Sequence, residues 1–385
     1  MFATLTSFSS LFMATLFMWL GIGLFNVFMG LRLSEDNVSE IWIGALMSAY
    51  YVGLVLGSRA GHRMIVRVGH SRAFAAAAAT CSVMVLAQAL VADKQVWVLF
   101  RIVAGASVAV QFMVIESWLN EQIENEHRGR IFSFYLVMSG VGIAIGQMAI
   151  ALFPTMDLRP LILVAICHTV GLIPIVWTVR LHPAPQLPAP LDFGYFIRRV
   201  PAGLGTMVIA GAITSAFFAL APVYVIGNDF STAEVATFMS AAVVAGLLAQ
   251  WPMGWLSDRI ARDRLIICNG ALLMLVTILL WGWLYIPFWL LMTISAISGV
   301  TQFTLYALAG SYANDLVPTD RRVSLSAVLL MSFGVGACIG PLLAGGLMRV
   351  AGVNMLYVFF TACSVVLILT AIQTRNRHVE RQNQP

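Results

Sequence analysis

The chain has 385 residues, of which 60% are hydrophobic and only 10% are charged, and its mean hydropathy is +0.89. Soluble globular proteins carry about 25% charged residues, so this composition excludes a soluble globular protein and predicts one that lies in a lipid bilayer. The net charge of +5 does not indicate a nucleic-acid partner, because arginine-rich loops that face anionic lipid headgroups account for it.

Twelve apolar segments are long enough to cross a bilayer. A spanning helix needs about 20 mostly apolar residues, because each residue adds about 1.5 Å to its length. The sequence therefore predicts an all-α integral membrane protein. Its twelve transmembrane helices are expected at residues 8–31, 41–60, 73–92, 95–117, 131–153, 160–180, 200–225, 234–256, 264–284, 286–312, 323–348 and 352–373.

The basic residues gather on one side of these segments. With the N-terminus inside, 17 of the 22 lysine and arginine residues lie in cytoplasmic connections or in the C-terminal tail. Cytoplasmic loops of membrane proteins carry an excess of these residues, so both termini are predicted to be cytoplasmic. The 17 are Arg59, Arg63, Arg67, Arg72, Arg128, Arg130, Arg180, Arg198, Arg199, Arg259, Arg262, Arg264, Arg321, Arg322, Arg375, Arg377 and Arg381.

The pentapeptides SWLNE (117–121) and SYAND (311–315) end the fourth and the tenth predicted helices. These positions are equivalent in two parallel repeats, which predicts six-helix bundles at 1–180 and 200–375. Four prolines within 181–199 disfavour a helix and predict a semi-rigid cytoplasmic linker, and 376–385 is expected to be a cytoplasmic tail. Two such halves, with a binding site near the midplane between them, form an alternating-access architecture.

No cofactor or metal site is expected. All five cysteines lie in predicted helices without the spacing of a metal site or an evident disulfide pair, so they are interpreted as packing residues. The 19 methionines raise the alternative of a copper carrier, because thioethers bind Cu(I), but no methionine pair is found at midplane depth. The sequence also lacks the metalloprotease and hydrolase motifs of an enzyme.

Two segments carry a family resemblance. GWLSDRIARDR at 254–264 resembles the loop motif G-x-L-a-D-R-x-G-R-R of the major facilitator superfamily through Gly254, Asp258, Arg259 and Arg262. LFRIVAGASVAV at 99–110 is similar to the fourth-helix motif of that superfamily, which begins with Arg101. The resemblance implies a fold of two pseudo-symmetric six-helix bundles and a transport function.

A third segment, GACIGPLLAGG at 336–346, resembles the glycine-proline helix-packing motif of the same superfamily. The matching residues are Gly336, Gly340, Pro341 and Gly345. The equivalent GIAIGQ of the first half has Gln147 where proline would stand. The stretch VIESWLN, followed by HRGRIFSFY and IGQ, is further similar to the bacterial YcaD-type carriers. The resemblance thus covers both halves of the chain.

The loop motif implies a cytoplasmic latch in the second half. In the family the loop aspartate pairs with nearby arginines, which here implies a gate of Gly254, Asp258, Arg259 and Arg262 with Asp315. The first-half loop GHRMIVRVGHSR (61–72) has no aspartate. Because Glu121 aligns with Asp315, a pair between Glu121 and Arg63 or Arg67 is expected there instead. The alternative for both groups is a set of solvated interfacial charges.

Ionisable residues within a membrane are costly, and they are functional candidates by default. Arg101, Glu116 and His168 are the candidates here. Arg101 could bind a substrate anion or form a structural contact. Glu116 could couple transport to protons or anchor the helix end through Asn120. His168 could titrate or remain a neutral, satisfied side chain. Further candidates are polar residues that line the site or bond between helices, namely Asn26, Gln111 and Gln302.

The predicted function is secondary transport of a small organic solute across the bacterial inner membrane by alternating access. A neutral, zwitterionic or anionic solute is favoured, because no predicted helix offers a cation a countercharge near midplane. Proton coupling and facilitated diffusion are both open, and a monomer is expected. The alternatives are a receptor or assembly factor on a carrier fold and the copper carrier.

Overall fold

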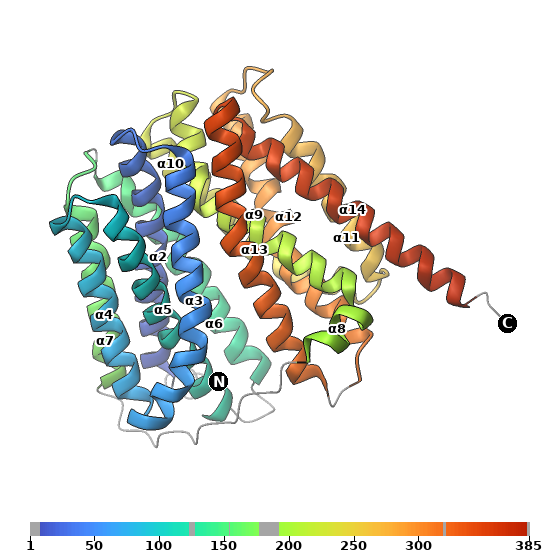
Figure 1. Ribbon diagram of the computed structural model, residues 1–385, viewed down its shortest axis with the longest axis horizontal. Helices are drawn as coiled ribbons and strands as arrows, with labels where there is room; N and C mark the ends of the chain where they lie inside the picture. Colours follow the sequence, from blue (N-terminus) through green and yellow to red (C-terminus); the bar gives the residue numbers. More distant parts are fainter. Residues whose placement is uncertain (1–7, 123–127, 154, 177–191, 319–320, 383–385) are drawn as a thin grey trace. The chain divides into compact units, whose positions relative to one another are not determined.

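The computed structural model describes residues 8–122, 128–153, 155–176, 192–318 and 321–382. These residues form thirteen α-helices and one short 3-10 helix, and no strand occurs among them. The helices are α2 (Ser9–Glu35), α3 (Glu40–Val68), α4 (His70–Leu90), α5 (Lys94–Gln122), α6 (Arg128–Ala149), α7 (Arg159–Val176), α8 (Phe193–Arg199), α9 (Pro201–Gly227), α10 (Thr232–Ser257), α11 (Arg262–Ile278), α12 (Phe288–Asp315), α13 (Arg322–Ala351) and α14 (Met355–Gln382), and the 3-10 helix η1 is Ile150–Leu152 (Figure 1).

The predicted all-α membrane fold is confirmed. Eleven helices of the described chain are long and apolar enough to cross a membrane. The ninth predicted span is the exception, because α11 has only 17 residues and so reaches about 26 Å, less than the hydrocarbon core of about 30 Å. The chain turns away at Gly282, which has a φ of 89° and lies against Asn354. A side chain at this glycine would be strained and would clash.

The described helices form two compact units. Unit 1 comprises 1–38, 45–187 and 231–240, and unit 2 comprises 39–44, 188–230 and 241–385. Unit 1 thus includes the start of α10, and unit 2 includes the start of α3. In unit 1, α2 packs against α6 and α7, and α4 packs against α5 and α7 (Figure 1). In unit 2, α9 packs against α13 and α14, and α11 packs against α12 and α14. The helix pairs of the two units therefore correspond.

Small residues bring equivalent helices into backbone contact in each unit. A Cβ on Gly336 or Gly340 of α13 would collide with the carbonyl oxygens of Val208 and Ala212 on α9. In unit 1, Gly142 and Gly146 of α6 lie against α2 in the same way. Association of helices in a bilayer depends on such close packing, because lipid is as apolar as the side chains. Pro341 and Gly345 lie farther along α13.

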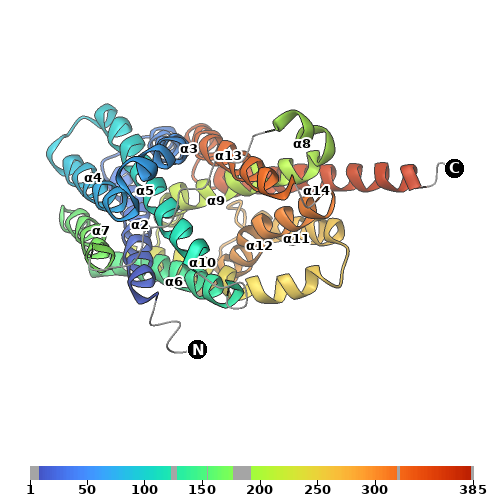
Figure 2. The same ribbon diagram turned by 90° about the horizontal axis from the view of Figure 1, so that it is seen from below.

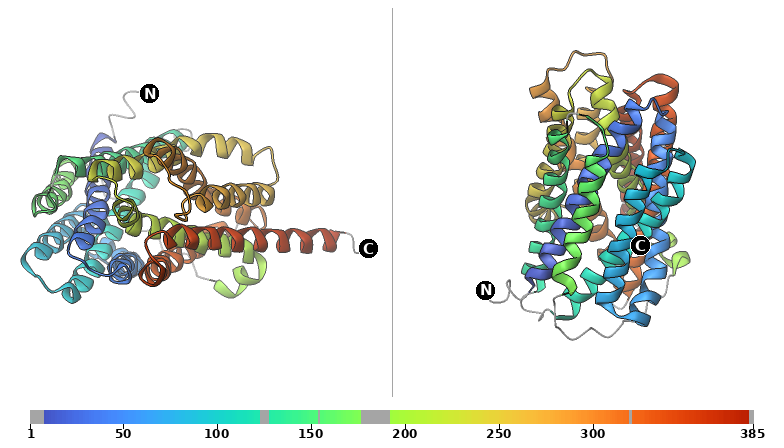
Figure 3. Two further views of the ribbon diagram at one scale, coloured as in Figure 1. Left: turned by 90° about the horizontal axis from the view of Figure 1, so that it is seen from above. Right: turned by 90° about the vertical axis from the view of Figure 1, so that its left-hand side faces the viewer.

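Two helical segments differ from the expected boundaries. Within the predicted linker, α8 forms because the Asp192 carboxylate accepts a hydrogen bond from the Tyr195 backbone N–H, at 3.2 Å, and caps the helix. Phe196 then buries its ring in an apolar cluster of unit 2. The linker prolines themselves lie outside the described residues. The other difference is α14, which continues to Gln382 and so includes most of the predicted tail (Figure 2; Figure 3, left).

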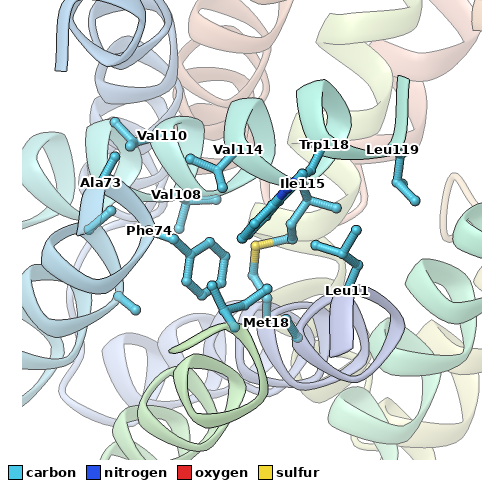
Figure 4. Close-up of a cluster of buried hydrophobic side chains, with 14 of the residues drawn as sticks. Leu11, Met18, Ala73, Phe74, Val108, Val110, Val114, Ile115, Trp118 and Leu119 are labelled. Carbon is cyan, nitrogen blue, oxygen red and sulfur yellow. The ribbon is translucent and has the colours of Figure 1, made fainter. Parts of the chain in front are cut away.

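An apolar cluster fills one end of unit 1. Leu11 and Met18 of α2, Phe74 of α4, and Ile115 and Trp118 of α5 are all buried in it (Figure 4). The long axes of the helices of this unit are roughly parallel (Figure 3, right). The same cluster extends to Ile22, Tyr50, Cys81, Ala104 and Val108. These five residues also line an internal cavity of unit 1.

Candidate functional site

A small internal cavity lies where five helices of unit 1 meet. The cavity has a volume of about 10 Å³, which is room for about one water molecule. Its lining combines apolar side chains with a guanidinium, an imidazole, a thiol, an amide and a phenol. The lining residues are Ile22, Phe25, Asn26, Tyr50, Cys81, Val85, Arg101, Ala104, Val108 and His168.

Arg101 dominates the electrostatics of the cavity. Its side chain has 0% exposure, and it is the only Asp, Glu, Lys or Arg among the buried residues of the described chain. Its Nε donates to the carbonyl oxygen of Leu46 at 3.3 Å, and its Nη2 contacts Sδ of Met47 at 3.0 Å. Its Nη1 has no hydrogen-bond partner. The guanidinium is therefore held by neutral groups, and no carboxylate lines the cavity.

Local packing explains how Arg101 reaches these partners. Gly105 lies one turn after Arg101 on α5, and a Cβ there would collide with the carbonyl oxygen of Tyr50 on α3. The close approach of α3 and α5 brings Leu46 and Tyr50 beside the guanidinium. The rings of Phe25 and Tyr50 each lie 4.8 Å from its central carbon, at a distance where a cation is attracted to an aromatic face. The fourth-helix motif thus has a packing function as well as a charge.

His168 of α7 is the second polar group in the cavity, and it is 3% exposed. Its Nε2 lies 3.4 Å from Sγ of Cys81, whereas its Nδ1 has no partner. Gly21 of α2 leaves room for the ring, because a Cβ there would lie 3.4 Å from Nε2. The sequence predicts only a packing role for Cys81 and does not indicate this contact. Only the fold brings Cys81 and His168, 87 positions apart, together.

The structure brings three of the six substrate and coupling candidates together. Arg101, His168 and Asn26 line the same cavity. Glu116 lies elsewhere on α5, with an exposed side chain that accepts a hydrogen bond of 3.4 Å from the Tyr135 hydroxyl. Gln111 is 1% exposed, and neither polar atom of its amide has a partner, but it does not line the cavity.

Unit 2 has a neutral interior. Gln302 of α12 is buried there with both amide atoms unpartnered. Nearby in the chain, Asn269 of α11 donates to the carbonyl oxygen of Thr301 and to the hydroxyl of Thr304, both at 3.1 Å. The buried polar residues described in unit 2 are hydroxyls and amides without formal charge. Gln302 therefore belongs to the neutral interior of unit 2, whereas Arg101 belongs to unit 1.

Of the expected latch residues of the second half, only Arg262, at the start of α11, has a close contact with Asp315. Arg262 pairs with Asp315 at 2.5 Å and donates to the carbonyl oxygen of Ser311 at 2.6 Å, both at the end of α12. Asp258 is more distant, at 4.0 Å from Arg262, and its side chain is 75% exposed. Arg259 instead lies over the ring of Trp255, at 3.8 Å. A Cβ placed on Gly254 would have no neighbour within 4 Å, so space alone does not require a glycine there.

The first half has a hydrogen-bonded counterpart of this latch, which the sequence patterns do not predict directly. His70 begins α4 as Arg262 begins α11, and its Nε2 lies 2.9 Å from Oγ of Ser117 at the end of α5. Ser117 and Ser311 open the repeated pentapeptides, so the alignment that links Glu121 to Asp315 contains the signal. Arg63 and Arg67 are exposed, and the Glu121 side chain lies outside the described residues.

No group of three or more His, Cys, Asp or Glu residues suited to a metal occurs in the part of the chain that the structure describes. The cavity itself contributes one imidazole and one thiol beside a guanidinium. A cation would be repelled by that guanidinium, so the residues of the cavity do not fit a metal ion.

Comparison with known proteins places the chain in a family. The family model of the Major Facilitator Superfamily matches residues 11–249 and 203–385. The MFS-type transporter Ent638_1421 of Enterobacter sp. (strain 638) is 25% identical over 375 residues, which is 94% of each chain. The MFS-type transporter YcaD of Escherichia coli (strain SE11) is 25% identical over 370 residues, which is 93% of each chain.

Solved structures share the fold. The nucleoside transporter NupG has a TM-score of 0.81 at 12% identity, covering 95% of this chain and 98% of its own. A bacterial homolog of the human lysosomal transporter Spinster, in an inward-facing and occupied conformation, has a TM-score of 0.76 at 14% identity and covers 94% of each chain. At these identities the likeness concerns the fold alone.

The family match extends over nearly the whole chain, and the helices have the lengths and composition of a multi-pass inner-membrane protein. Proteins of this family move small molecules across lipid bilayers, and the relatives from Enterobacter and Escherichia coli are named as transporters. The chain belongs to the major facilitator superfamily and is a membrane transporter.

Proposed function

We propose that the chain is a secondary active transporter of a small organic solute that is anionic, zwitterionic or neutral. It would work by alternating access, with both termini in the cytoplasm. The observation that carries the charge preference is Arg101, the only buried residue with a full formal charge among the described side chains. A buried cationic solute would meet this charge without a compensating carboxylate, which is costly.

A carboxylate would suit the groups around Arg101. Its Nε and Nη2 already have partners, while Nη1 has none, and Asn26 lines the same cavity. Hydrogen bonds between ionised partners are shorter and about twice as strong as neutral ones. The present cavity holds about one water-sized particle, so a solute would have to enter when the helices separate during the transport cycle.

His168 is a better candidate than Glu116 for coupling transport to protons. His168 lines the cavity with Arg101, so a change in its protonation would act directly on the charge of the site. Glu116 has an exposed side chain and bonds to Tyr135 instead. A role for Glu116 would therefore need a pathway that does not pass through the cavity.

The contacts of Arg262 support a latch role for the second-half motif. Arg262 joins the start of α11 to the end of α12 through Asp315 and Ser311. The first half would use the hydrogen bond between His70 and Ser117 at the corresponding position. We propose that both contacts fix the helix ends of their own unit, which would let each unit move as a body during transport.

The proposal is tested by transport in proteoliposomes. A thermal-shift screen of the purified protein against metabolites identifies a solute, because a ligand stabilises the state that it binds. Uptake of that solute is then measured for the wild type and for Arg101→Lys, which keeps the charge but loses the planar fork. Because a hydrogen bond to a charged group contributes about 1.5–3 kcal/mol, we expect KM to rise about tenfold or more.

Arg159→Lys is the matched control, because Arg159 is exposed and pairs with Asp157 outside the cavity. Its KM should equal that of the wild type. Arg101→Ala should impair uptake more than Arg101→Lys. Wild-type affinity in both Arg101 variants would make Arg101 structural and remove the argument for an anionic solute. The absence of any solute flux would refute the transport assignment itself.

A further inference from the structure

Arg101 is a buried cation without a counterion. Its contacts are a carbonyl oxygen, a thioether and two aromatic rings, all of them neutral. Isolating an ionised group from water is costly unless it is paired. Dipoles and ring faces offset a part of that cost, but none of them balances the charge. The lining of the cavity contains no carboxylate that could do so.

Two polar atoms of the cavity lining have no hydrogen-bond partner, and an amide lies beside them. Nη1 of Arg101 and Nδ1 of His168 have no hydrogen-bond partner, and both residues are more than nine-tenths buried. Asn26 lines the cavity with them and is 6% exposed. If the Cys81 thiol donates to Nε2 of His168, the ring proton lies on Nδ1, which makes that atom a donor as well. The unpartnered donor atoms of the cavity are thus suited to a ligand that accepts hydrogen bonds.

We propose that this cavity binds a single small inorganic anion of the size of chloride, with Nη1 of Arg101 as its main donor and the amide of Asn26 beside it. A water molecule would satisfy the donors but leave the guanidinium charge unbalanced. A metal ion would be repelled by the guanidinium. Sulfate, phosphate and organic acids exceed a cavity that holds about one water-sized particle. A monatomic anion meets both the charge and the size.

The apolar cluster of Figure 4 shares residues with the wall of this site. Met18, Phe74 and Ile115 are buried there, and the cluster includes Ile22, Cys81 and Val108 of the cavity wall. Such packing excludes water, and an electrostatic interaction in a dry interior is stronger than the same interaction at the surface. The site would therefore bind the monatomic anion tightly. The bound anion would exchange with anions in solution only when the helices around it move.

The test uses the purified full-length protein and needs no organic substrate. Sodium gluconate is replaced stepwise by sodium chloride at constant ionic strength, and the thermal unfolding temperature is followed. A ligand that binds only the folded state stabilises it. We therefore expect the thermal unfolding temperature to rise with chloride concentration until it saturates, and to stay unchanged in gluconate. Bromide should raise the unfolding temperature by a similar amount, whereas nitrate and sulfate should raise it less because they are larger.

Arg101→Gln should abolish the chloride-dependent rise, and Asn26→Leu should weaken it. Arg159→Gln should keep it, because that arginine is exposed and belongs to a separate ion pair. If Arg101→Gln does not fold, the site can still be tested by ³⁵Cl NMR. The wild-type protein should broaden the chloride signal, and added bromide should reverse the broadening. Asn26→Leu should then show weaker broadening than the wild type.

Equal unfolding temperatures in chloride and gluconate would overturn the proposal. So would a chloride effect that persists in a folded Arg101→Gln variant, because that effect would come from exposed arginines. Neither result bears on solute transport, which is measured separately. If transport is established, a carboxylate substrate should compete with chloride for Arg101, a step that rests on the proposed function.

Discussion

The ion pairs of Arg262 predict an order of importance within the latch motif. Asp315 lies 2.5 Å from Arg262, whereas Asp258 lies at 4.0 Å and is 75% exposed. Exposed pairs contribute about 0.2–1 kcal/mol, so Asp258→Asn should change stability by a few tenths of a kcal/mol and Asp315→Asn by up to about 1 kcal/mol. The loop aspartate of the family motif is thus expected to matter less here than its partner at the end of α12.

Arg262→Ala should have the largest effect, because it also removes the charged hydrogen bond to the Ser311 carbonyl. A hydrogen bond to a charged group contributes about 1.5–3 kcal/mol, so the total loss should be about 2–3 kcal/mol. Thermal unfolding in detergent and initial uptake rates in proteoliposomes would be measured for all three variants. An Asp258→Asn variant that loses as much stability or transport as Asp315→Asn would refute this reasoning.

Two further predictions concern coupling and packing. His168→Gln should flatten any dependence of uptake on a pH gradient, whereas Glu116→Gln should retain it; the reverse result in matched proteoliposomes would transfer the coupling role to Glu116. Gly336→Ala should lower the thermal unfolding temperature strongly, because its Cβ would collide with the Val208 carbonyl. Gly205→Ala, with nothing within 4 Å, should be neutral or stabilising, since alanine favours helix by about 1 kcal/mol; equal losses in both variants would contradict the packing argument.

Hydropathy and the repeated pentapeptides are sufficient to predict the architecture. A spanning helix is a local feature, because its length and composition follow from the thickness of the bilayer. The exceptions have local causes that the hydropathy pattern does not register. Tryptophans and leucines around Gly282 keep the ninth predicted span apolar beyond Ile278, where the helix ends. Asp192 caps a helix in a segment where nearby prolines suggest none.

The candidate site is predictable only in part. Arg101, Asn26 and His168 stand out in the sequence because polar groups in spans are costly, but their meeting in one cavity depends on how five helices are rotated. Spacing along α5 does not show that Glu116 is exposed and Arg101 buried. The contact between Cys81 and His168 cannot be predicted from the sequence for the same reason. Hydrophobic spans have weak amphipathic patterns, so the sequence contains little information on which face turns inward.

The two units share the same helix packing, but they differ in where their charged residues lie. Unit 1 has the buried charge, Arg101, and joins its helix ends through the hydrogen bond between His70 and Ser117. Unit 2 has an uncharged interior among its described residues and joins the same helix ends through the ion pair of Arg262 and Asp315. A buried charge responds to ligand and protonation, whereas a partly exposed ion pair is weakened by salt. Ligand binding should therefore act first on unit 1, and rising ionic strength should weaken the Arg262–Asp315 pair at the helix ends of unit 2.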